Sequence, residues 1–522
     1  MKTMELLPLL GVAILLAIRA GATTFYVNVA NPSPAAPFTN WSTAATDIQT
    51  AIDTATDGDL ILVTNGIYNT GGRVVYGSLT NRVVIGKAVT VQSVSGPTTT
   101  VIQGNPGIGS KPVRCVYLTN YAVISGFTLS NGATLNTGDS YQEDSGGGLL
   151  CCSNSIATNC ILTHNSAYFF GGGAFGLGSS YETTCGTLTS CSVLQNVSSN
   201  YGGGVSGVTL TSCLLSNNVA SMGGGAHQAV LTNCIITQNA STNMGGGTYW
   251  SSLYGCLVTS NYSNAYGGVY MSGSGPYGVM NCTIIGNNAA GGAGGLQAGF
   301  SSVFNCIIYY NTVSTGTASN YSAGSTFQNC CTLPKPSGTF YIIITNAPSF
   351  VDCANGDYHL QSNSPCINSG RNPASIQTDL DGNPRTIDGF VDIGAYEYQA
   401  ASSILPFYFA QQYGLSVDGT IDSDGDGMDN FQEAEAGTNP TNAASVLRMT
   451  SISNSISGAT VTWQCVNSRN YSLQCSTNLA AQPAFSTIAT TLSSPFRTTL
   501  SFKDTNAVGP GPFFYRVIAG GY

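Results

Sequence analysis

A repeat in the middle of the chain constrains its fold more than any other feature. Glycine triplets, or looser glycine clusters, begin at seven positions, and successive starts lie 25, 31, 21, 22, 22 and 24 residues apart. The starts are Gly146, Gly171, Gly202, Gly223, Gly245, Gly267 and Gly291. A short period with variable insertions predicts a solenoid, in which each unit stacks on its neighbours and the insertions lie outside.

A second pattern recurs in step with the glycines. Each unit has a cysteine that is followed two residues later by an aliphatic side chain and five residues later by asparagine. The cysteines are Cys160, Cys191, Cys213, Cys234, Cys256, Cys282 and Cys306; the aliphatic residues are Leu162, Val193, Leu215, Ile236, Val258, Ile284 and Ile308; and the asparagines are Asn165, Asn196, Asn218, Asn239, Asn261, Asn287 and Asn311. Side chains two apart on a strand share a face, so we expect the first two groups to point into the interior.

The asparagines and the residues before the glycines predict two further files. Asparagine falls at a turn, where it tolerates left-handed backbone angles and can bond to the asparagine of the next coil. The residues before the glycines are Phe170, Tyr201, Met222, Met244 and Tyr266. Buried cysteine behaves as a small apolar residue, and no CxxC sequence supports zinc. The pattern predicts an all-β right-handed parallel β-helix with coils about 4.8 Å apart.

From Gly146 to Asn311 the repeat resembles that of chlamydial-type polymorphic outer-membrane proteins, with its GGA or GGG and FxxN elements. Two departures stand out. An aliphatic residue replaces the phenylalanine in all seven units, and nothing matches the C-terminal translocator barrel of that family. The resemblance implies display at a cell surface and specifies no chemistry.

Residues 1–22 have the features of a signal peptide. Lys2 precedes an apolar stretch from Leu6 to Ile18, and Ala20-Gly21-Ala22 is a small-residue cleavage site. A membrane anchor is the alternative, but the apolar stretch is shorter than the roughly 20 residues that cross a bilayer. We therefore expect no transmembrane span and a protein that is secreted, extracellular or on the outer cell surface.

Residues 46–55 are typical of a short amphipathic helix. Thr46 and Gln49 fit a capping box, and the apolar residues of one face are Ile48, Ala51, Ile52 and Ala55. Strand-like runs follow at Leu60–Val63, Val83–Ile85, Val89–Val94, Val113–Leu118 and Ala122–Leu129. A helix that leads into such coils resembles the N-terminal cap of pectin-lyase-like β-helices, which implies that it covers the open end of the column.

The segment from Asp357 to Tyr398 resembles the choice-of-anchor Q region, which closes many bacterial surface β-helices before an attachment module. Its aspartates are Asp379, Asp381, Asp388 and Asp392. They form either a carboxylate cluster or, as we expect, turns in a C-terminal cap at about residues 351–398. In an exported protein Cys353 and Cys366 are candidates for a disulfide. The β-helix would then span residues 23–400, with repeats at about 146–330.

Residues 404–442 contain a calcium-loop pattern, D-x-D-x-D-G-x5-E, that begins at Asp422. The predicted ligands are Asp422, Asp424, Asp426, the carbonyl of Met428, Asn430 and bidentate Glu433. Gly427 permits the sharp turn, and Pro406–Gly414 and Phe431–Ala436 are predicted flanking helices. The loop resembles those of EF-hand, dockerin and thrombospondin type 3 modules. We expect a structural Ca²⁺ here; the alternative is a solvated acidic linker.

Residues 446–522 are typical of a small β-sandwich, similar in general terms to fibronectin type III modules. The expected strands are Val461–Cys465, Tyr471–Cys475, Arg497–Phe502 and Phe513–Ile518, which alternate apolar and polar positions. Cys465 and Cys475 are expected on neighbouring strands, where they could form a disulfide.

Catalysis and binding are the two functional alternatives. Pectin-lyase-like folds include polysaccharide lyases and glycoside hydrolases, which need carboxylates and, in lyases, a basic side chain. Between Ser145 and Phe350 the only charged residues are Glu182 and Lys335. The remaining catalytic candidates are Asp139, Glu143 and Asp144, together with Arg114 one coil earlier. His164, His227 and His359 are isolated in the sequence and suggest no catalytic pair.

We expect binding without catalysis, as an adhesin or a glycan-binding spacer, with a polysaccharide or a surface protein as ligand. Tyrosines and a tryptophan gather late in the repeat, at Tyr249, Trp250, Tyr254, Tyr262, Tyr270, Tyr277, Tyr309 and Tyr310. Outward-facing aromatic rings suit neutral sugars or another protein. A net charge of −9 without a basic stripe speaks against nucleic acid as a partner.

Overall fold

The protein was analysed as a computed structural model, which describes residues 21–520 apart from 120, 179–183, 272–276, 300–301, 316–318, 323, 325, 338–341, 372–375, 388, 401–402, 467–468 and 493–497. Except for its last two residues, the predicted signal peptide lies outside the described residues, and so does Asp388. The chain divides into two compact units, residues 1–328 with 332–339 and residues 329–331 with 340–522.

The first unit is a column of stacked coils. Its first sheet contains β1 (Thr24–Val27), β2 (Leu60–Val63), β6 (Thr90–Ser93), β9 (Val123–Ser125), β12 (Ile156–Thr158), β16 (Thr187–Thr189), β20 (Thr209–Thr211), β24 (Val230–Thr232), β28 (Ser252–Tyr254), β32 (Gly278–Met280), β36 (Ser302–Phe304) and β39 (Thr326–Gln328), in that order. Its second sheet contains β3 (Gly66–Tyr68), β7 (Thr100–Gln103), β10 (Thr128–Ser130), β13 (Ile161–Thr163), β17 (Ser192–Leu194), β21 (Leu214–Ser216), β25 (Ile235–Thr237), β29 (Leu257–Thr259), β33 (Thr283–Ile285) and β37 (Ile307–Tyr309).

Two further sheets complete the wall of the column. The third contains β4 (Arg73–Val74), β5 (Thr80–Ile85), β8 (Val113–Leu118), β11 (Leu149–Cys151), β15 (Ala174–Gly176), β19 (Val205–Ser206), β23 (Ala226–His227), β27 (Thr248–Tyr249), β31 (Val269–Tyr270) and β35 (Leu296–Gln297). The fourth contains β14 (Ser166–Ala167), β18 (Val197–Ser198), β22 (Val219–Met222), β26 (Ala240–Met244), β30 (Tyr262–Ser263), β34 (Asn288–Ala289) and β38 (Thr312–Val313).

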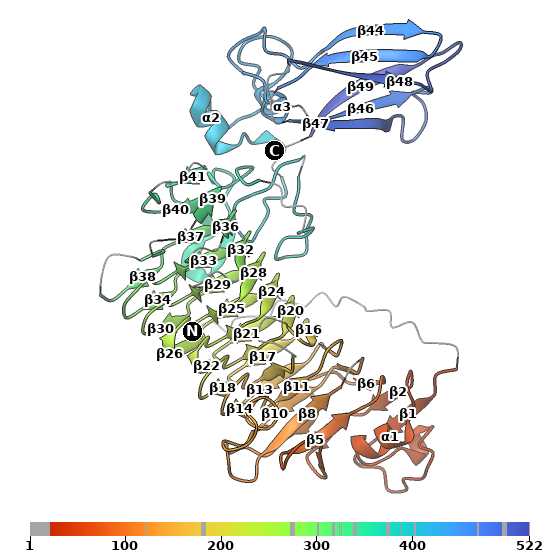
Figure 1. Ribbon diagram of the computed structural model, residues 1–522, viewed down its shortest axis with the longest axis vertical. Coiled ribbons are helices and arrows are strands. Elements are labelled where there is room, and N and C mark those ends of the chain that lie inside the picture. The colour runs from red at the N-terminus through yellow and green to blue at the C-terminus, as the bar shows by residue number, and fades with distance from the viewer. Residues whose placement is uncertain are drawn as a thin grey trace. The chain divides into compact units, whose positions relative to one another are not determined.

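One coil passes through the third, first, second and fourth sheets, as in β15, β16, β17 and β18, and the next glycine triplet returns the chain to the third sheet. Equivalent strands of successive coils lie side by side (Figure 1) and pair in parallel, as in Leu162 with Val193 and Val193 with Leu215. This path confirms the predicted right-handed parallel β-helix.

The predicted interior files are present. All seven cysteines and all seven aliphatic residues of the pattern are buried. Each asparagine amide donates to the side chain of the next asparagine, as from Asn196 to Asn218 at 3.0 Å and from Asn218 to Asn239 at 2.9 Å. The same amide groups also donate to a carbonyl of the preceding coil, as from Asn196 to Leu162 at 2.9 Å. Burial and full pairing explain why this residue recurs.

One detail of the turn differs from the prediction. The left-handed position is not the ladder asparagine but the residue before it, with positive φ at His164, Gln195, Asn217, Gln238, Ser260, Gly286 and Tyr310. These corner residues are exposed, whereas the asparagines are buried. An asparagine amide that bonds along the column axis must point inward. The residue before it therefore adopts the left-handed conformation at the corner.

The N-terminal end of the column carries the predicted helix, α1 (Ile48–Thr54), whose buried side includes Ile48, Ala51 and Ile52. The predicted capping box of Thr46 and Gln49 is wrong, because the Asp47 carboxylate caps the helix by accepting from the Thr50 N–H. Gln49 instead exchanges two hydrogen bonds with the backbone of Val84.

The predicted strand Ala122–Leu129 is divided into β9 and β10. Gly126, with φ of 79°, turns the chain between them at a corner of the coil. The other expected runs of this region agree with β2, β5, β6 and β8 within a few residues.

The second unit begins with short strands, β40 (Cys330–Thr332, whose last residue belongs to the first unit), β41 (Ile343–Ile344) and the antiparallel pair β42 (Phe350–Asp352) and β43 (Asp357–Leu360). Two helices follow, α2 (Phe407–Tyr413) and α3 (Asn430–Ala436). Short 3₁₀ helices lie at Trp41–Thr43 in the first unit and at Cys353–Asn355 in the second.

The chain ends in two three-stranded antiparallel sheets. One contains β44 (Met449–Ser455), β45 (Gly458–Gln464) and β48 (Thr499–Asp504), and the other contains β47 (Ser486–Leu492), β46 (Asn470–Ser476) and β49 (Phe514–Gly520). Trp463 and Leu500 of the first sheet and Tyr471 and Leu473 of the second share one buried cluster.

Neither proposed disulfide is present, since all seventeen cysteines lie among the described residues and none is linked to another by a disulfide. Cys465 follows β45 and Cys475 lies on β46, which belong to different sheets, so the expected neighbouring strands are wrong. Cys353 is exposed, whereas Cys366 is buried and contacts Cys331.

Candidate functional sites

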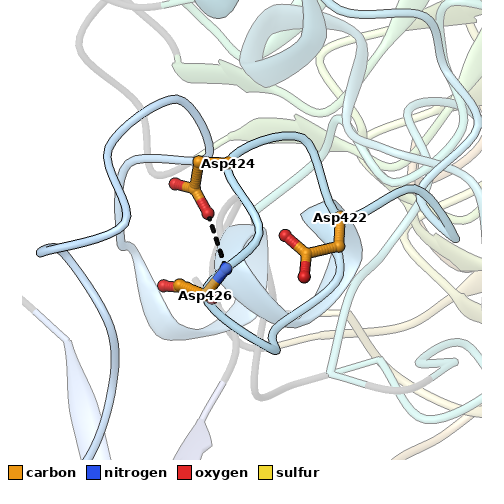
Figure 2. A group of neighbouring side chains, drawn as sticks. All are labelled: Asp422, Asp424 and Asp426. Carbon is orange, nitrogen blue, oxygen red and sulfur yellow. Dashed lines mark hydrogen bonds between the residues drawn. The ribbon is translucent and has the colours of Figure 1, made fainter.

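The predicted calcium loop brings its three aspartates together. One carboxylate oxygen of each of Asp422, Asp424 and Asp426 lies within 4.8 Å of the others (Figure 2). The loop is shaped by these same side chains, since Asp422 accepts from the N–H groups of Gly425 at 2.8 Å and Gly427 at 3.0 Å. Both glycines have left-handed backbone angles, as the sharp turn requires.

Two of these aspartates each have one carboxylate oxygen with no hydrogen-bond partner in the described part of the chain. Asp424 and Asp426 use Oδ1 to accept an N–H within the loop, from Asp426 and Met428 respectively. Their Oδ2 atoms are buried and have no hydrogen-bond partner among the residues that the structure describes. Met428 lies in the loop as expected.

Helix α3 supplies the last two predicted ligands. Asn430 and Glu433 are buried, and Asn430 Oδ1 and Glu433 Oε2 also lack a partner within the described part of the chain. Burial raises the pKa of Glu433 to about 7, and the Asp424 carboxylate adds to this effect. Five carboxylate and amide side chains with orphaned or clustered oxygens fit a hard cation, and oxygen is what Ca²⁺ prefers.

The alternative catalytic residues do come together, but their polar atoms are engaged. Arg114 is buried and donates to the carbonyls of Gly146, Gln142 and Ser145 and to the Asn81 side chain, at 2.6 to 2.9 Å. Burial lowers its pKa to about 10. A guanidinium with this set of acceptors holds the chain in place and has little freedom to meet a substrate.

The carboxylates beside it hold the same insertion. Glu143 accepts from the Ser78 N–H at 2.6 Å, which lowers its pKa, and from the Asp139 N–H at 3.1 Å. Asp144 accepts from the Gly138 N–H at 3.1 Å, and its burial raises its pKa. These contacts favour a structural role for the group.

An outer aromatic layer covers the third sheet. Strands β15, β23, β27 and β31 of that sheet carry Phe175, His227, Tyr249 and Tyr270, and the corner residues Phe170, Tyr201 and Tyr266 pack beside them. Among the first four, Tyr270 is half-buried and the other three are buried. The rings contact from coil to coil: centroids are 5.3 Å apart for Phe170 and Phe175, 5.7 Å for His227 and Tyr249, and 5.2 Å for Tyr249 and Tyr270. We call these seven residues the outer aromatic layer.

Sequence reasoning found this layer only in part. Of the aromatic residues expected late in the repeat, Tyr249 and Tyr270 belong to it, and Trp250 packs against it with its centroid 4.7 Å from that of Tyr249. The other predicted aromatic residues lie elsewhere, with Tyr254 on the first sheet, Tyr262 on the fourth, and Tyr309 and Tyr310 at the end of the second. The missed signal is the residue four places after a glycine triplet begins, which is Phe175, His227 and Tyr249 in three of the five triplets and Leu150 and Ser206 in the others.

His227 has a partner that its sequence position does not indicate. Its Nδ1 lies 2.9 Å from the hydroxyl of Ser206 on the preceding coil, and both side chains are buried. Burial lowers the pKa of His227 to about 3, so the ring is neutral. A neutral ring stacked at 5.6 Å on Phe170 serves as part of the aromatic layer.

The cap aspartates of the second unit divide between turns and a buried cluster. Asp379 accepts from the N–H groups of Asp381 and Asn383, as the turn prediction requires, and also from that of Glu397. Asp392 is fully buried, and Arg385 lies 3.6 Å from Glu397. Burial raises the pKa of Asp392 to about 6 and that of Glu397 to about 10.

Asp381 instead joins His359 in a surface ion pair. The two ring nitrogens of His359 lie 2.7 Å from Asp381 and 2.6 Å from Asp357. The hydrogen bond to Asp381, followed by the one to Asp357, raises the pKa of His359 to about 9.

No protein-family model matches this chain, and no curated protein matches it. Among solved structures it is similar to pectate lyase Pel9A, with 15% identity over 72% of this chain and 97% of that one and a TM-score of 0.46. It is also similar to XylC in complex with xylose, with 11% identity over 61% and 76% of the two chains and a TM-score of 0.39. The Dettilon tailspike protein gp208 has 13% identity over 95% and 94%, with a TM-score of 0.30. Values this low carry no conclusion about what this chain binds.

Among the residues that the structure describes, no helix combines the length and the apolar character that crossing a bilayer requires.

Proposed function

We propose that this chain is an exported surface β-helix that binds a neutral polysaccharide along the outer aromatic layer without cleaving it. The observation that carries the proposal is a continuous row of rings on one face, in which Tyr201, Tyr266 and Tyr270 are only half-buried. Flat apolar rings stack on the C–H faces of sugars, and coils about 4.8 Å apart repeat such contacts along an extended chain.

The charge of the column supports a neutral ligand. From Ser145 to Phe350 the sequence has only Glu182 and Lys335 as charged residues, so an acidic polysaccharide would find almost no cation to pair with. Proton transfer also needs titratable groups near the ligand. His227 is buried with its pKa lowered to about 3 and suits neither the acid nor the base role at neutral pH.

One experiment distinguishes binding of a polysaccharide from its cleavage. The chain without residues 1–22 is titrated with neutral and acidic polysaccharides, and the products are analysed for shortened or unsaturated chains. We expect binding of a neutral polysaccharide, with intact ligand recovered. Tyr201→Ala and Tyr266→Ala should each weaken binding about fivefold, in line with about 1 kcal/mol per aromatic contact.

Tyr310→Ala is the matched control, since Tyr310 is an exposed tyrosine at the end of the second sheet and should leave binding unchanged. Equal losses from all three variants would contradict the assignment to the aromatic layer. Cleavage products that disappear in Asp139→Asn or Asp144→Asn would favour a polysaccharide lyase or hydrolase instead.

Calcium binding belongs to the same proposal. Asp422, Asp424, Asp426, Asn430 and Glu433 would hold one Ca²⁺ with a structural role in the second unit. The support is the set of buried oxygens that lack a partner among the described residues. If Asp424→Ala and Glu433→Ala leave calcium affinity and melting temperature as in the unchanged protein, the assignment is wrong.

A further inference from the structure

Helix α3 is shared by the candidate calcium loop and the C-terminal sheets. Its seven residues include Asn430 and Glu433, and the Asn430 amide donates to the Ser423 hydroxyl of the loop at 3.0 Å. Its N-terminal backbone is tied to the loop as well, because the Asn430 N–H donates to Ile421 O at 2.8 Å and the Phe431 N–H donates to Gly419 O at 2.9 Å. Any displacement of this helix therefore moves two of the proposed ligands.

The C-terminal end of α3 contacts strand β46 and the residue before it. Arg469 Nη2 donates to Ala434 O at 3.0 Å, and the Tyr471 hydroxyl donates to Ala436 O at 3.2 Å. Both side chains are buried, at 5% and 0% exposed. The last carbonyls of a helix carry partial negative charge, so a guanidinium at this end is favourable.

The end of the helix lies close to the Arg469 side chain. At Gly437, which ends α3 with φ of 77°, an added Cβ would lie 2.6 Å from Arg469 Nε. The Tyr471 hydroxyl also accepts from the Val466 N–H at 2.8 Å, which fixes it in the sheet. The sheets thus hold α3 through two directed hydrogen bonds and a close backbone approach.

The other side of α3 belongs to a separate apolar cluster. Phe431 packs against Phe390 with centroids 5.3 Å apart, in a cluster with Leu405, Phe409 and Ala434. The helix is therefore held from both sides, by the region before the loop and by the sheets after it.

We infer that Arg469 and Tyr471 are positioning residues of the calcium loop, so that calcium binding and docking of the C-terminal sheets on α3 strengthen each other. This inference rests on the calcium binding proposed above. Without a cation, the clustered carboxylates of Asp422, Asp424 and Asp426 repel one another in the loop to which α3 is tied, which destabilises the loop and the position of the helix. A bound cation removes that repulsion and fixes the helix whose carbonyls the sheets contact. By reciprocity, undocking the sheets weakens calcium binding by the same factor.

The test uses the chain without residues 1–22, with calcium affinity measured by calorimetry and docking measured by amide exchange of Val466 and by proteolysis between residues 437 and 447. We expect calcium to slow both exchange and cleavage. Arg469→Met should weaken calcium affinity about tenfold and reduce the protection that calcium confers. Tyr471→Phe keeps the buried ring, removes only the hydroxyl, and should act in the same direction by about threefold.

Arg516→Met is the control, because Arg516 is an exposed arginine of β49 that pairs with Gln474. It should change neither calcium affinity nor protection. The inference is wrong, while the calcium site stands, if both variants bind calcium as tightly as the unchanged protein. The same holds if calcium binds but changes neither amide exchange nor cleavage. An unchanged protein that binds no calcium would overturn the proposed calcium site and the inference with it.

Discussion

The column and the second unit are stabilised by opposite means. In the column, one set of contacts recurs from coil to coil: a thiol, an aliphatic side chain and an amide, each above its equivalent. In the second unit, contacts are made once each, by polar groups such as Arg385 with the Glu397 carboxyl and Arg469 with the Ala434 carbonyl. Repetition allows a nearly uncharged sequence to specify its register, because any slip would break the same contact in many coils.

The difference also predicts how each region responds to its surroundings. The column has almost no group that titrates near neutral pH, whereas the second unit contains buried or paired carboxylates and histidine with shifted pKa values. We expect the column to be insensitive to pH and calcium, and the second unit to depend on both. Four predictions test this contrast, from the largest expected effect to the smallest.

The largest loss of stability should come from substituting an asparagine of the ladder in the column. Asn239 Nδ2 donates to Leu215 O and Asn261 Oδ1, and its own Oδ1 accepts two N–H groups of Asn218. Asn239→Ala leaves several buried groups without a partner, so we expect a loss of about 4 kcal/mol, measured by urea denaturation followed by circular dichroism. Gln238→Asn is the control: this exposed neighbour is left-handed, and asparagine tolerates that conformation. Similar losses of unfolding free energy from both variants would show that the buried ladder contributes no more to stability than its exposed neighbour.

Calcium should stabilise the second unit and leave the column unchanged. At calcium one hundred times above the dissociation constant, binding adds about 2.7 kcal/mol to the folded state that binds it. In calorimetry we expect a chelator to lower one transition only, and we expect Glu433→Gln to lose most of this response. If calcium shifts both transitions, the column also responds to calcium and the two regions do not differ in this respect.

The two buried carboxylates of the cap, Glu397 and Asp392, should differ in how much stability the protein loses when each is replaced by its amide. The pKa of Glu397 is raised to about 10 from an ordinary value near 4.5, so the folded state binds a proton that the unfolded state releases. Its contribution is therefore most favourable at low pH and declines as pH rises from about 5 through 10. Glu397→Gln should be neutral or stabilising at pH 8 and should reduce this decline, with melting followed across pH at saturating calcium.

Asp392→Asn is the contrasting variant. Asp392 accepts from the N–H groups of Asn368 and Tyr398, both at 2.7 Å, and an amide can replace only one carboxylate oxygen. We expect a loss of about 2 kcal/mol at pH 8. If Glu397→Gln is the more damaging of the two, Glu397 is ionised in the folded protein and burial does not keep its carboxyl protonated.

The smallest effect should come from the surface pair of His359. Its pKa is raised to about 9 from 6.5, so its contribution is fully present below pH 6.5 and is lost as pH rises through 9. The ring is 46% exposed, and solvent screening limits the contribution to under about 1 kcal/mol. His359→Gln should lower the melting temperature slightly at pH 6 and leave it unchanged at pH 10; an equal effect at both would mean that charge is not involved.

The periodic part of the structure was predictable residue by residue. The cysteine and the aliphatic residue keep a fixed spacing, and strands alternate faces, so the spacing alone assigned both to the interior. The asparagines were expected to bond from coil to coil, as they do, but their burial and the left-handed residue before them were not predicted. The calcium-loop pattern likewise brought Asp422, Asp424 and Asp426 together as expected. Asn320, in contrast, continues the ladder after Asn311 only nine residues later, outside the period, and went unpredicted.

Contacts without a period were not predictable. His359 meets Asp381, which lies 22 residues further along, and the disulfide pairs proposed from nearby positions do not form among the seventeen cysteines. The aromatic residues gather late in the repeat, but the sequence did not assign them to faces, and those on strands are divided among four sheets. Their faces depend on where each coil turns, and insertions of varying length displace that point.

The sequence by itself determined the coil, its register and the contents of its interior, because stacking at a constant spacing converts a repeat in the chain into a line in space. Only the tertiary structure decided which side chains line the outer face, which titratable groups are buried together, and how α3 comes to lie between the candidate calcium loop and the C-terminal sheets. Those contacts join segments that share no period, so their meeting depends on how the whole second unit and each corner of the column pack.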